Sequence, residues 1–425
     1  MPAVFTRVRR TRPRLKSAMV AHPPFTKGRH YKGPSSWTPL ILLDNFKKLN
    51  SARGLWAAIA LAIAARIGIF VASIIHPISN ERGLPVSPLH TQAYWDFQFY
   101  LTSLARYTES FSEITQEFIK FYQDPFNSPV IPFISGPVFP LVIKILDYGP
   151  ENFLPAALFY LLVSIVLCAA WIIWLSKKGV PTLWLIVFAL IPNPIWFTLV
   201  ISPDLLFAAL FAVFFLLYFE VRPSAAQTTG WVVALITMLL LRPNGFSVLL
   251  FVAVHAAWLM IQNRNINFLR GSLVLVLLVV FGLYLYPYFL REMQFAGSLL
   301  GYFGYAPSEY TNGLFPALPG WIDHPVSWAA LVAAKFVYFV GLRPSYGVTE
   351  TLLVVARGGA GLILLPGIFY LFWAGRRSEM ALIALYCLPI LLGPAQDRYY
   401  LPIYPILFLY GVMAYQAVWR AVSNR

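Results

Sequence analysis

The sequence predicts an all-α polytopic membrane protein with about 10 transmembrane helices, and an eleventh stays open. Of its 425 residues, 59% are hydrophobic, whereas a soluble domain is nearer to about 45–50% apolar. Several apolar stretches approach the roughly 20 residues that cross a bilayer core. Basic residues are concentrated before the first of these stretches and recur at every second connection after it, which is the pattern of a multi-pass protein.

The basic character of the chain is concentrated at its N-terminus. We expect residues 1–53 to form a cytoplasmic, partly disordered segment and residues 54–425 to form the transmembrane domain. Asp44 is the only acidic residue before the first span. Such a segment could bind nucleic acid, or it could be held inside by its charge and attracted to anionic lipid. We favour membrane lipids over nucleic acid as its partner because a span follows directly.

The first span is expected at 55–75, and Arg66 inside it either snorkels to the interface or has a partner in a polar cavity. A long outer-face loop follows over 76–152. It holds an amphipathic stretch between Tyr100 and Phe126, which suits an interfacial helix. A proline-containing stretch that re-enters the membrane follows it. The later spans are expected near 154–175, 182–201, 205–219, 230–241, 245–261, 272–290, 352–373, 380–392 and 401–418. The span at 182–201 is expected to be broken near Pro192 and Pro194.

A second outer-face loop is expected over 291–349, and it contains the apolar piece 326–340, interrupted by Lys335. If this piece crossed the membrane, Arg376 and Arg377 would lie outside, against the positive-inside rule. We therefore expect a re-entrant or interfacial helix there, which gives ten spans with both termini in the cytoplasm. A crossing would give eleven.

Cysteine and histidine usage indicates no metal or redox chemistry. Cys168 and Cys387 both lie inside apolar spans, and the six histidines show no metal-ligand spacing. There is also no phosphate-binding glycine loop of the kind that soluble nucleotide sites use. The sequence assigns no cofactor with certainty; a divalent cation stays open but is not indicated.

This topology collects polar residues on the outer face. Asp96 lies among aromatic residues just beyond the first span, and an isolated carboxylate there suits a general base. Isolated Arg and Lys side chains at the same level suit the charge of a phosphate leaving group. The candidate catalytic residue is Asp96, and the candidate substrate-binding residues are His90, Tyr94, Trp95, Asp204, Arg242, Lys335, Arg343, Asp397, Arg398 and Tyr399.

Each candidate also has a purely structural alternative. Asp96 could cap a helix, and Asp204 could be favoured by the dipole at the start of its span. Arg242 could snorkel to the headgroups, and Arg398 could pair with Asp397 or with lipid phosphate. A buried Lys335 needs a partner in either case, His90 could be a loop histidine, and aromatic residues at span ends anchor in the interface.

Five short strings follow one another in a recognisable order: YWDFQFY at 94–100, GPVFPL at 136–141, SPDLLF at 202–207, LRPNG at 241–245 and DRYYLPIYP at 397–405. With this order and sidedness, the chain from about residue 55 resembles the GT-C superfamily of integral-membrane glycosyltransferases. That superfamily includes the protein O-mannosyltransferases, the aminoarabinose transferase acting on lipid A and the GPI mannosyltransferases.

The resemblance implies an inverting hexosyltransferase that uses a polyprenyl-phosphate sugar donor and a lipid, glycan or protein acceptor. It assigns catalysis to the first-loop acid, which is Asp96 here. Several relatives carry a second acid beside the first, whereas Trp95 and Phe97 flank Asp96 in this chain. That departure weakens an assignment to the protein O-mannosyltransferase branch and leaves metal dependence open.

Three other functions compete with this one: a transporter or lipid flippase, a polysaccharide polymerase or ligase, and a membrane protein with no active site. A transporter should show matched repeats in two halves, and none is evident. For the enzyme, we expect the bacterial plasma membrane with the active site outside, or the endoplasmic reticulum membrane in a eukaryote.

Overall fold

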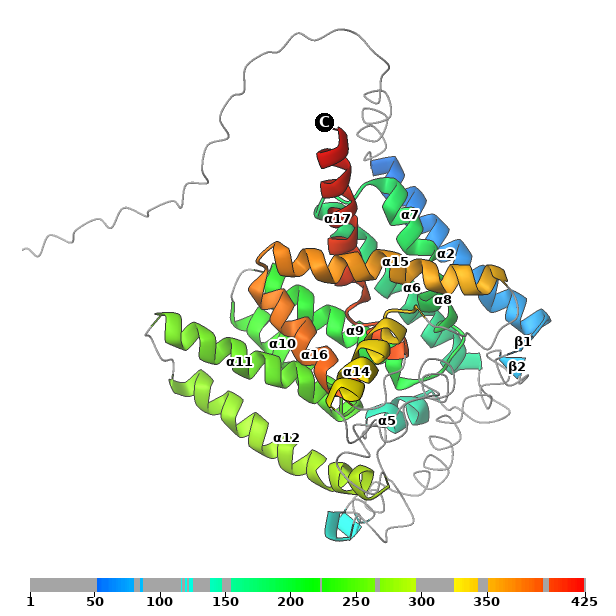
Figure 1. The fold of residues 1–425 in the computed structure, drawn as a ribbon. Coiled ribbons are helices and arrows are strands. Elements are labelled where there is room, and N and C mark those ends of the chain that lie inside the picture. The colour runs from blue at the N-terminus through cyan, green and yellow to red at the C-terminus, as the bar shows by residue number, and fades with distance from the viewer. Residues whose placement is uncertain are drawn as a thin grey trace, which may run out of the picture. The chain divides into compact units, whose positions relative to one another are not determined.

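The structure is a computed structural model, and it describes residues 52–79, 85–86, 116, 119–120, 122–124, 138–146, 154–221, 224–263, 268–295, 325–342, 351–392 and 397–423. These residues are almost entirely helical, as the sequence predicts (Figure 1). The sheet within them is a two-residue antiparallel pair, β1 (Ile78–Ser79) with β2 (Pro85–Val86).

The helices follow the expected apolar stretches. They are α2 (Ala52–Ile75), α5 (Val138–Ile145), α6 (Leu154–Lys177), α7 (Thr182–Leu190), α8 (Pro192–Trp196), α9 (Pro203–Phe215) with the π-helical continuation η2 (Leu216–Glu220), α10 (Ala225–Leu241), α11 (Gly245–Asn263), α12 (Phe268–Phe295), α14 (Pro325–Phe339), α15 (Thr351–Trp373), α16 (Arg377–Leu392), the 3₁₀ turn η5 (Asp397–Tyr400) and α17 (Tyr404–Ser423).

Within the described part, four helices are long and apolar enough to cross a membrane: Ala52–Ile75, Leu154–Lys177, Pro203–Glu220 and Tyr404–Ser423. Shorter apolar helices lie at Ala225–Leu241, Gly245–Leu259 and Gly358–Trp373. Helices of this length and composition are typical of a helical membrane protein.

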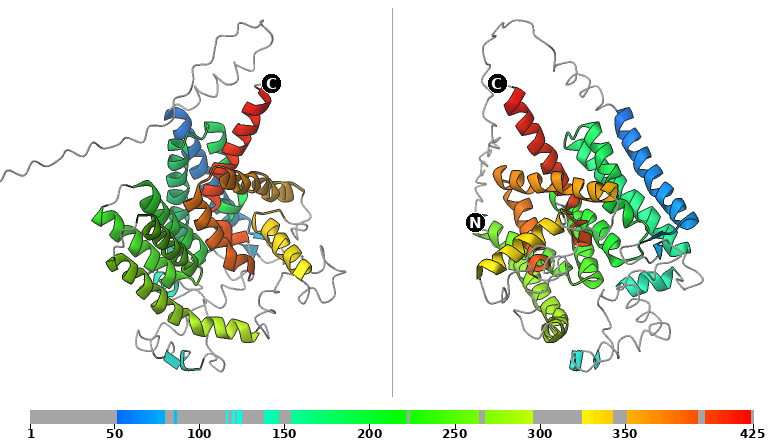
Figure 2. Two further views of the ribbon diagram at one scale, coloured as in Figure 1. Left: turned by 60° about the vertical axis from the view of Figure 1, so that its left-hand side comes forward. Right: turned by 45° about the vertical axis from the view of Figure 1, so that its right-hand side comes forward.

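The core is built around α6, α9 and α17. Helix α2 packs on α6 and α7, α9 packs on α6 and α10, and α11 packs on α10, α12 and α16 (Figure 2). Aromatic side chains fill much of the interior; for example, Trp171, Trp174 and Phe215 contact one another at ring-centroid distances of 5.2–5.8 Å. The helix of the third span is broken near Pro192 and Pro194, as the sequence predicts. It ends at Leu190 and resumes as the short α8, because Pro192 and Pro194 cannot donate helical hydrogen bonds.

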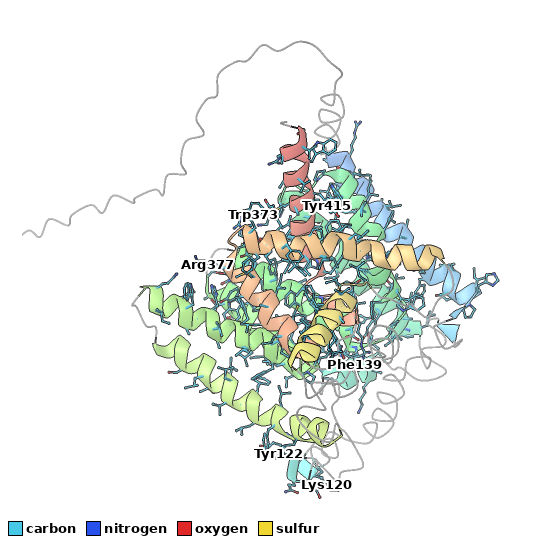
Figure 3. The ribbon with its side chains drawn as sticks, viewed as in Figure 1. Lys120, Tyr122, Phe139, Trp373, Arg377 and Tyr415 are labelled. Carbon is cyan, nitrogen blue, oxygen red and sulfur yellow. The ribbon has the colours of Figure 1, made fainter. Side chains whose placement is uncertain are left out.

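Helices α15 and α17 cross at close range. A Cβ atom at Gly367 would overlap the carbonyl oxygen of Leu407, and one at Gly411 would overlap that of Ile363. Pro366 deprives the Leu362 carbonyl of its helical donor, and the Tyr415 hydroxyl donates to that carbonyl at 2.7 Å. Figure 3 labels Tyr415 beside this crossing. Small residues and a hydroxyl donor are thus what hold these two helices together.

Candidate functional site

Asp204 occupies the first turn of α9, where Ser202 is extended and Pro203 starts the helix with a favourable backbone angle. The side chain is 4% exposed. Its carboxylate forms an ion pair with Arg242 through Oδ1 and lies 3.9 Å from Nη1 of Arg398 through Oδ2. Asp204 therefore does more than respond to the helix dipole, because it joins three segments that are distant in the sequence.

Arg242 lies in the tight connection between α10 and α11. It is extended because Pro243 follows it, and α10 ends there. The chain then turns through Asn244 into α11. At Gly245 a Cβ atom would come within 2.7 Å of the Leu239 backbone, so glycine allows this turn to close against α10. The turn holds the Arg242 guanidinium, which is 6% exposed, beside the start of α9.

Tyr399, in η5, lies beneath both arginines. Its ring centroid is 5.0 Å from Cζ of Arg242 and 5.3 Å from Cζ of Arg398. The Tyr386 hydroxyl donates to the Tyr399 backbone carbonyl at 2.9 Å, which fixes η5 against α16. We call Asp204, Arg242, Arg398 and Tyr399 the Asp204 cluster.

The Asp204 cluster leaves some buried polar atoms without partners among the described residues. Among the described side chains, two guanidinium groups share one carboxylate. Nε of Arg242 and Oδ2 of Asp204 are buried and have no hydrogen-bond partner there. Buried polar atoms are normally satisfied, so such atoms need a reason, and a bound ligand is one. The Nε of Arg242 is an N–H donor of the kind that binds an anion, whereas Oδ2 of Asp204 is an acceptor and would bind a donor.

Lys335 contributes a further cation near the cluster. Helix α14 packs against η5 and α16, and Phe339 contacts Tyr400 edge-on at 6.2 Å. Lys335 precedes Phe339 by one helical turn, so both project from the same face of α14. The side chain is fully buried, and burial lowers the pKa of Lys335 to about 8. The apolar piece expected at 326–340 thus brings its one charge toward the site.

The structure does not describe the side chains of the remaining predicted site residues. His90, Tyr94, Trp95, Asp96 and Arg343 lie outside the described residues. Asp397 begins η5, but its side chain is also outside them. For these residues the sequence predictions stand as predictions.

Two residues have structural roles that the sequence analysis does not predict. Tyr386 supports the Tyr399 backbone, and its signal was a lone hydroxyl within the apolar stretch 380–392. The sequence shows Gly245 only as the last residue of the LRPNG string. The structure shows that its lack of a side chain lets the turn close against α10. In the described part of the chain, no group of three or more His, Cys, Asp or Glu residues could hold a metal ion.

Comparisons of this chain with family models, with curated proteins and with solved structures found no match.

Proposed function

We propose that the protein is an integral-membrane glycosyltransferase that moves a sugar from a polyprenyl-phosphate donor to a lipid, glycan or protein acceptor. The observation that carries the proposal is the convergence of Arg242 and Arg398 on Asp204 and Tyr399, with a buried Nε of Arg242 that has no partner among the described residues. A lipid-linked phosphate is an anion of the kind that guanidinium groups bind. The sugar chemistry rests on the order of sequence motifs that resemble the GT-C superfamily.

In this proposal the acceptor hydroxyl oxygen attacks the anomeric carbon while the bond to the donor phosphate oxygen breaks, with inversion. The departing phosphate gains negative charge, which Arg242 and Arg398 stabilise through N–H donors held in place before the reaction. Asp204 keeps Arg242 in position by pairing with it. Asp96, on the first outer-face loop, accepts the proton from the acceptor hydroxyl.

The proposed topology keeps ten spans, with both termini in the cytoplasm and the Asp204 cluster at the outer face. The start of α9, the end of α10 and the turn before α17 meet at one end of the helices, as alternating spans require. The proposed location is the bacterial plasma membrane, or the endoplasmic reticulum membrane in a eukaryote.

The test is transfer by the purified protein in lipid, measured over a panel of polyprenyl-phosphate sugars. Asp96→Asn should fold and lose transfer activity. Arg398→Gln should fold and lower kcat by roughly 10²–10³, as removal of a single oxyanion donor does. Lys178→Gln, at the far end of α6 from the cluster, is the matched control and should leave the rate unchanged.

Full activity of Arg398→Gln would remove the cluster from the proposed mechanism. Full activity of Asp96→Asn would keep the enzyme class and move the base to Asp204 or Asp397. Substrate-dependent flux in sealed vesicles without any transfer would replace the enzyme with a transporter.

A further inference from the structure

Arg66 lies in the middle of α2, far from both ends of that helix, yet only 2% of it is exposed. Its Nε donates to Ser164 Oγ on α6 at 3.0 Å, and Nη1 donates to the carbonyls of Ala62 and Ala189 at 3.1 and 3.3 Å. The Ala189 carbonyl belongs to the last turn of α7, before the proline break. Arg66 therefore joins three helices and does not snorkel to an interface.

The charge of Arg66 has no counter-charge among the described residues. No carboxylate there lies within ion-pair distance of it, and its hydrogen bonds go to neutral oxygen atoms. A guanidinium group has five N–H donors, and these contacts leave both hydrogen atoms of Nη2 unused. Burying a cation without an opposite charge is costly, because neutral dipoles replace only part of its hydration.

The arginine also lines a small cavity of about 30 Å³. Ser164 shares the polar side of this cavity, and its hydroxyl is 2.9 Å from that of Thr198. Cys168, Trp171 and Leu205 contribute to the apolar walls. About 10–15 Å³ is enough for one water molecule, so the cavity has room for a ligand larger than a single water but not for a phosphate with its sugar.

We propose that this cavity binds a small monovalent anion of halide size, such as chloride, on Nη2 of Arg66. An anion supplies the charge that the neutral partners cannot, and a halide needs only a few N–H or O–H donors and tolerates apolar walls. Water alone would satisfy the free donors but not the charge. This site is independent of the proposed sugar transfer, because Arg66 and Ser164 lie outside the Asp204 cluster.

The direct test is diffraction from crystals of the full chain in which bromide replaces chloride. We expect an anomalous bromine peak in the cavity, within hydrogen-bonding distance of Arg66 Nη2. An ordered water molecule with no anomalous signal at that position would overturn the proposal. This measurement uses the unmodified protein, so it does not depend on any variant folding.

A second test compares thermal unfolding in lipid nanodiscs in chloride and in gluconate at equal ionic strength, because gluconate is too large for the cavity. Chloride should raise the Tm by roughly 2–4 °C, since a ligand that binds only the folded state stabilises it. Equal Tm values in the two salts would count against the site.

Two variants localise the effect. Arg66→Gln removes the cation, and Ala208→Leu fills the cavity while leaving the hydrogen bonds of Arg66 in place. Both variants should have the same Tm in chloride and in gluconate. Arg420→Gln, which removes an exposed cation near the end of α17, should keep the higher Tm in chloride. A chloride effect that survives Ala208→Leu would place the anion elsewhere and refute the proposal.

Discussion

Two polar clusters at opposite ends of α9 and its continuation differ in how well their groups are matched. The Asp204 cluster lies at the start of α9. Tyr218, in η2, is 14 residues further along, which is about 20 Å at the rise of a helix. Its hydroxyl is 2.6 Å from Nδ1 of His255, and Nε2 of that ring is 3.3 Å from Ser378 Oγ. We call Tyr218, His255 and Ser378 the His255 cluster.

Every polar group named in the His255 cluster has a partner of the right kind. The ring of His255 takes one hydroxyl on each nitrogen, and Lys178 pairs with Glu220 nearby at 2.8 Å. Packing α9, α11 and α16 together is sufficient reason for these contacts. At the Asp204 cluster, Nε of Arg242 and Oδ2 of Asp204 are buried and have no hydrogen-bond partner among the described residues. We infer that the unmatched end is the end that receives a ligand.

The largest predicted effect is the loss of the shared carboxylate. Asp204→Asn removes the carboxylate that Arg242 and Arg398 both approach, and the free energy of unfolding should fall by about 3–5 kcal/mol. Arg242→Met should lower the free energy of unfolding by less, because Arg398 can still pair with Asp204. Unfolding in a denaturing-detergent titration measures both, with Glu220→Gln as the control. An equal loss of unfolding free energy in the two variants would show that Arg398 does not share the carboxylate.

The next effect concerns the ring between the two arginines. Tyr399→Leu removes a face that both guanidinium groups contact, and the free energy of unfolding should fall by about 1–2 kcal/mol. Tyr399→Phe keeps the ring and should behave like the wild type. The same unfolding titration compares them. A large loss in Tyr399→Phe would mean that the hydroxyl, not the ring, matters.

At the matched end, a single substitution should cost less and leave function intact. His255→Phe should lower the free energy of unfolding by about 1 kcal/mol, because neutral hydrogen bonds contribute that much. Transfer activity should stay at the wild-type rate. The double variant that combines His255→Phe with Tyr218→Phe should lose less unfolding free energy than the two single variants lose in total. An inactive His255→Phe that folds normally would extend the site to this end.

The smallest effect is expected at the partly exposed pair of Lys178 and Glu220. Glu220→Gln should cost about 0.2–1 kcal/mol at low salt. The difference from wild type should disappear at 1 M salt, where the screening length is about 3 Å. Thermal unfolding at two salt concentrations tests this. A cost that persists in high salt would indicate a shielded pair.

Much of the helical framework was predictable, because long apolar runs bounded by charges leave few choices. The stretch expected at 154–175 is α6 at Leu154–Lys177, and the one expected at 55–75 is α2 at Ala52–Ile75. The break in the stretch 182–201 is also predictable, because Pro192 and Pro194 interrupt its apolar run; α7 ends before them and α8 is restricted to one turn.

The site was predictable only as a set of residues at one end of the spans. Alternating spans place Asp204, Arg242 and Arg398 at the same end, but they do not say how each helix is rotated. Rotation decides that Arg242 pairs with Asp204 and that Tyr399 lies under both arginines. It also decides the supporting contact of Tyr386, because a lone hydroxyl in an apolar helix does not show which carbonyl it will contact. The role of Asp96 stays a prediction from sequence.

The buried arginine of α2 has a consequence for the order in which the chain assembles. Arg66 and its partner Ser164 are 98 residues apart. At a synthesis rate of about 5–20 residues per second, α2 exists for roughly 5–20 s before that partner is made. An arginine at the centre of a lone helix opposes insertion by about 2.5–3.5 kcal/mol. We therefore expect α2 to wait beside the insertion machinery until α6 and α7 arrive and to enter the bilayer together with them.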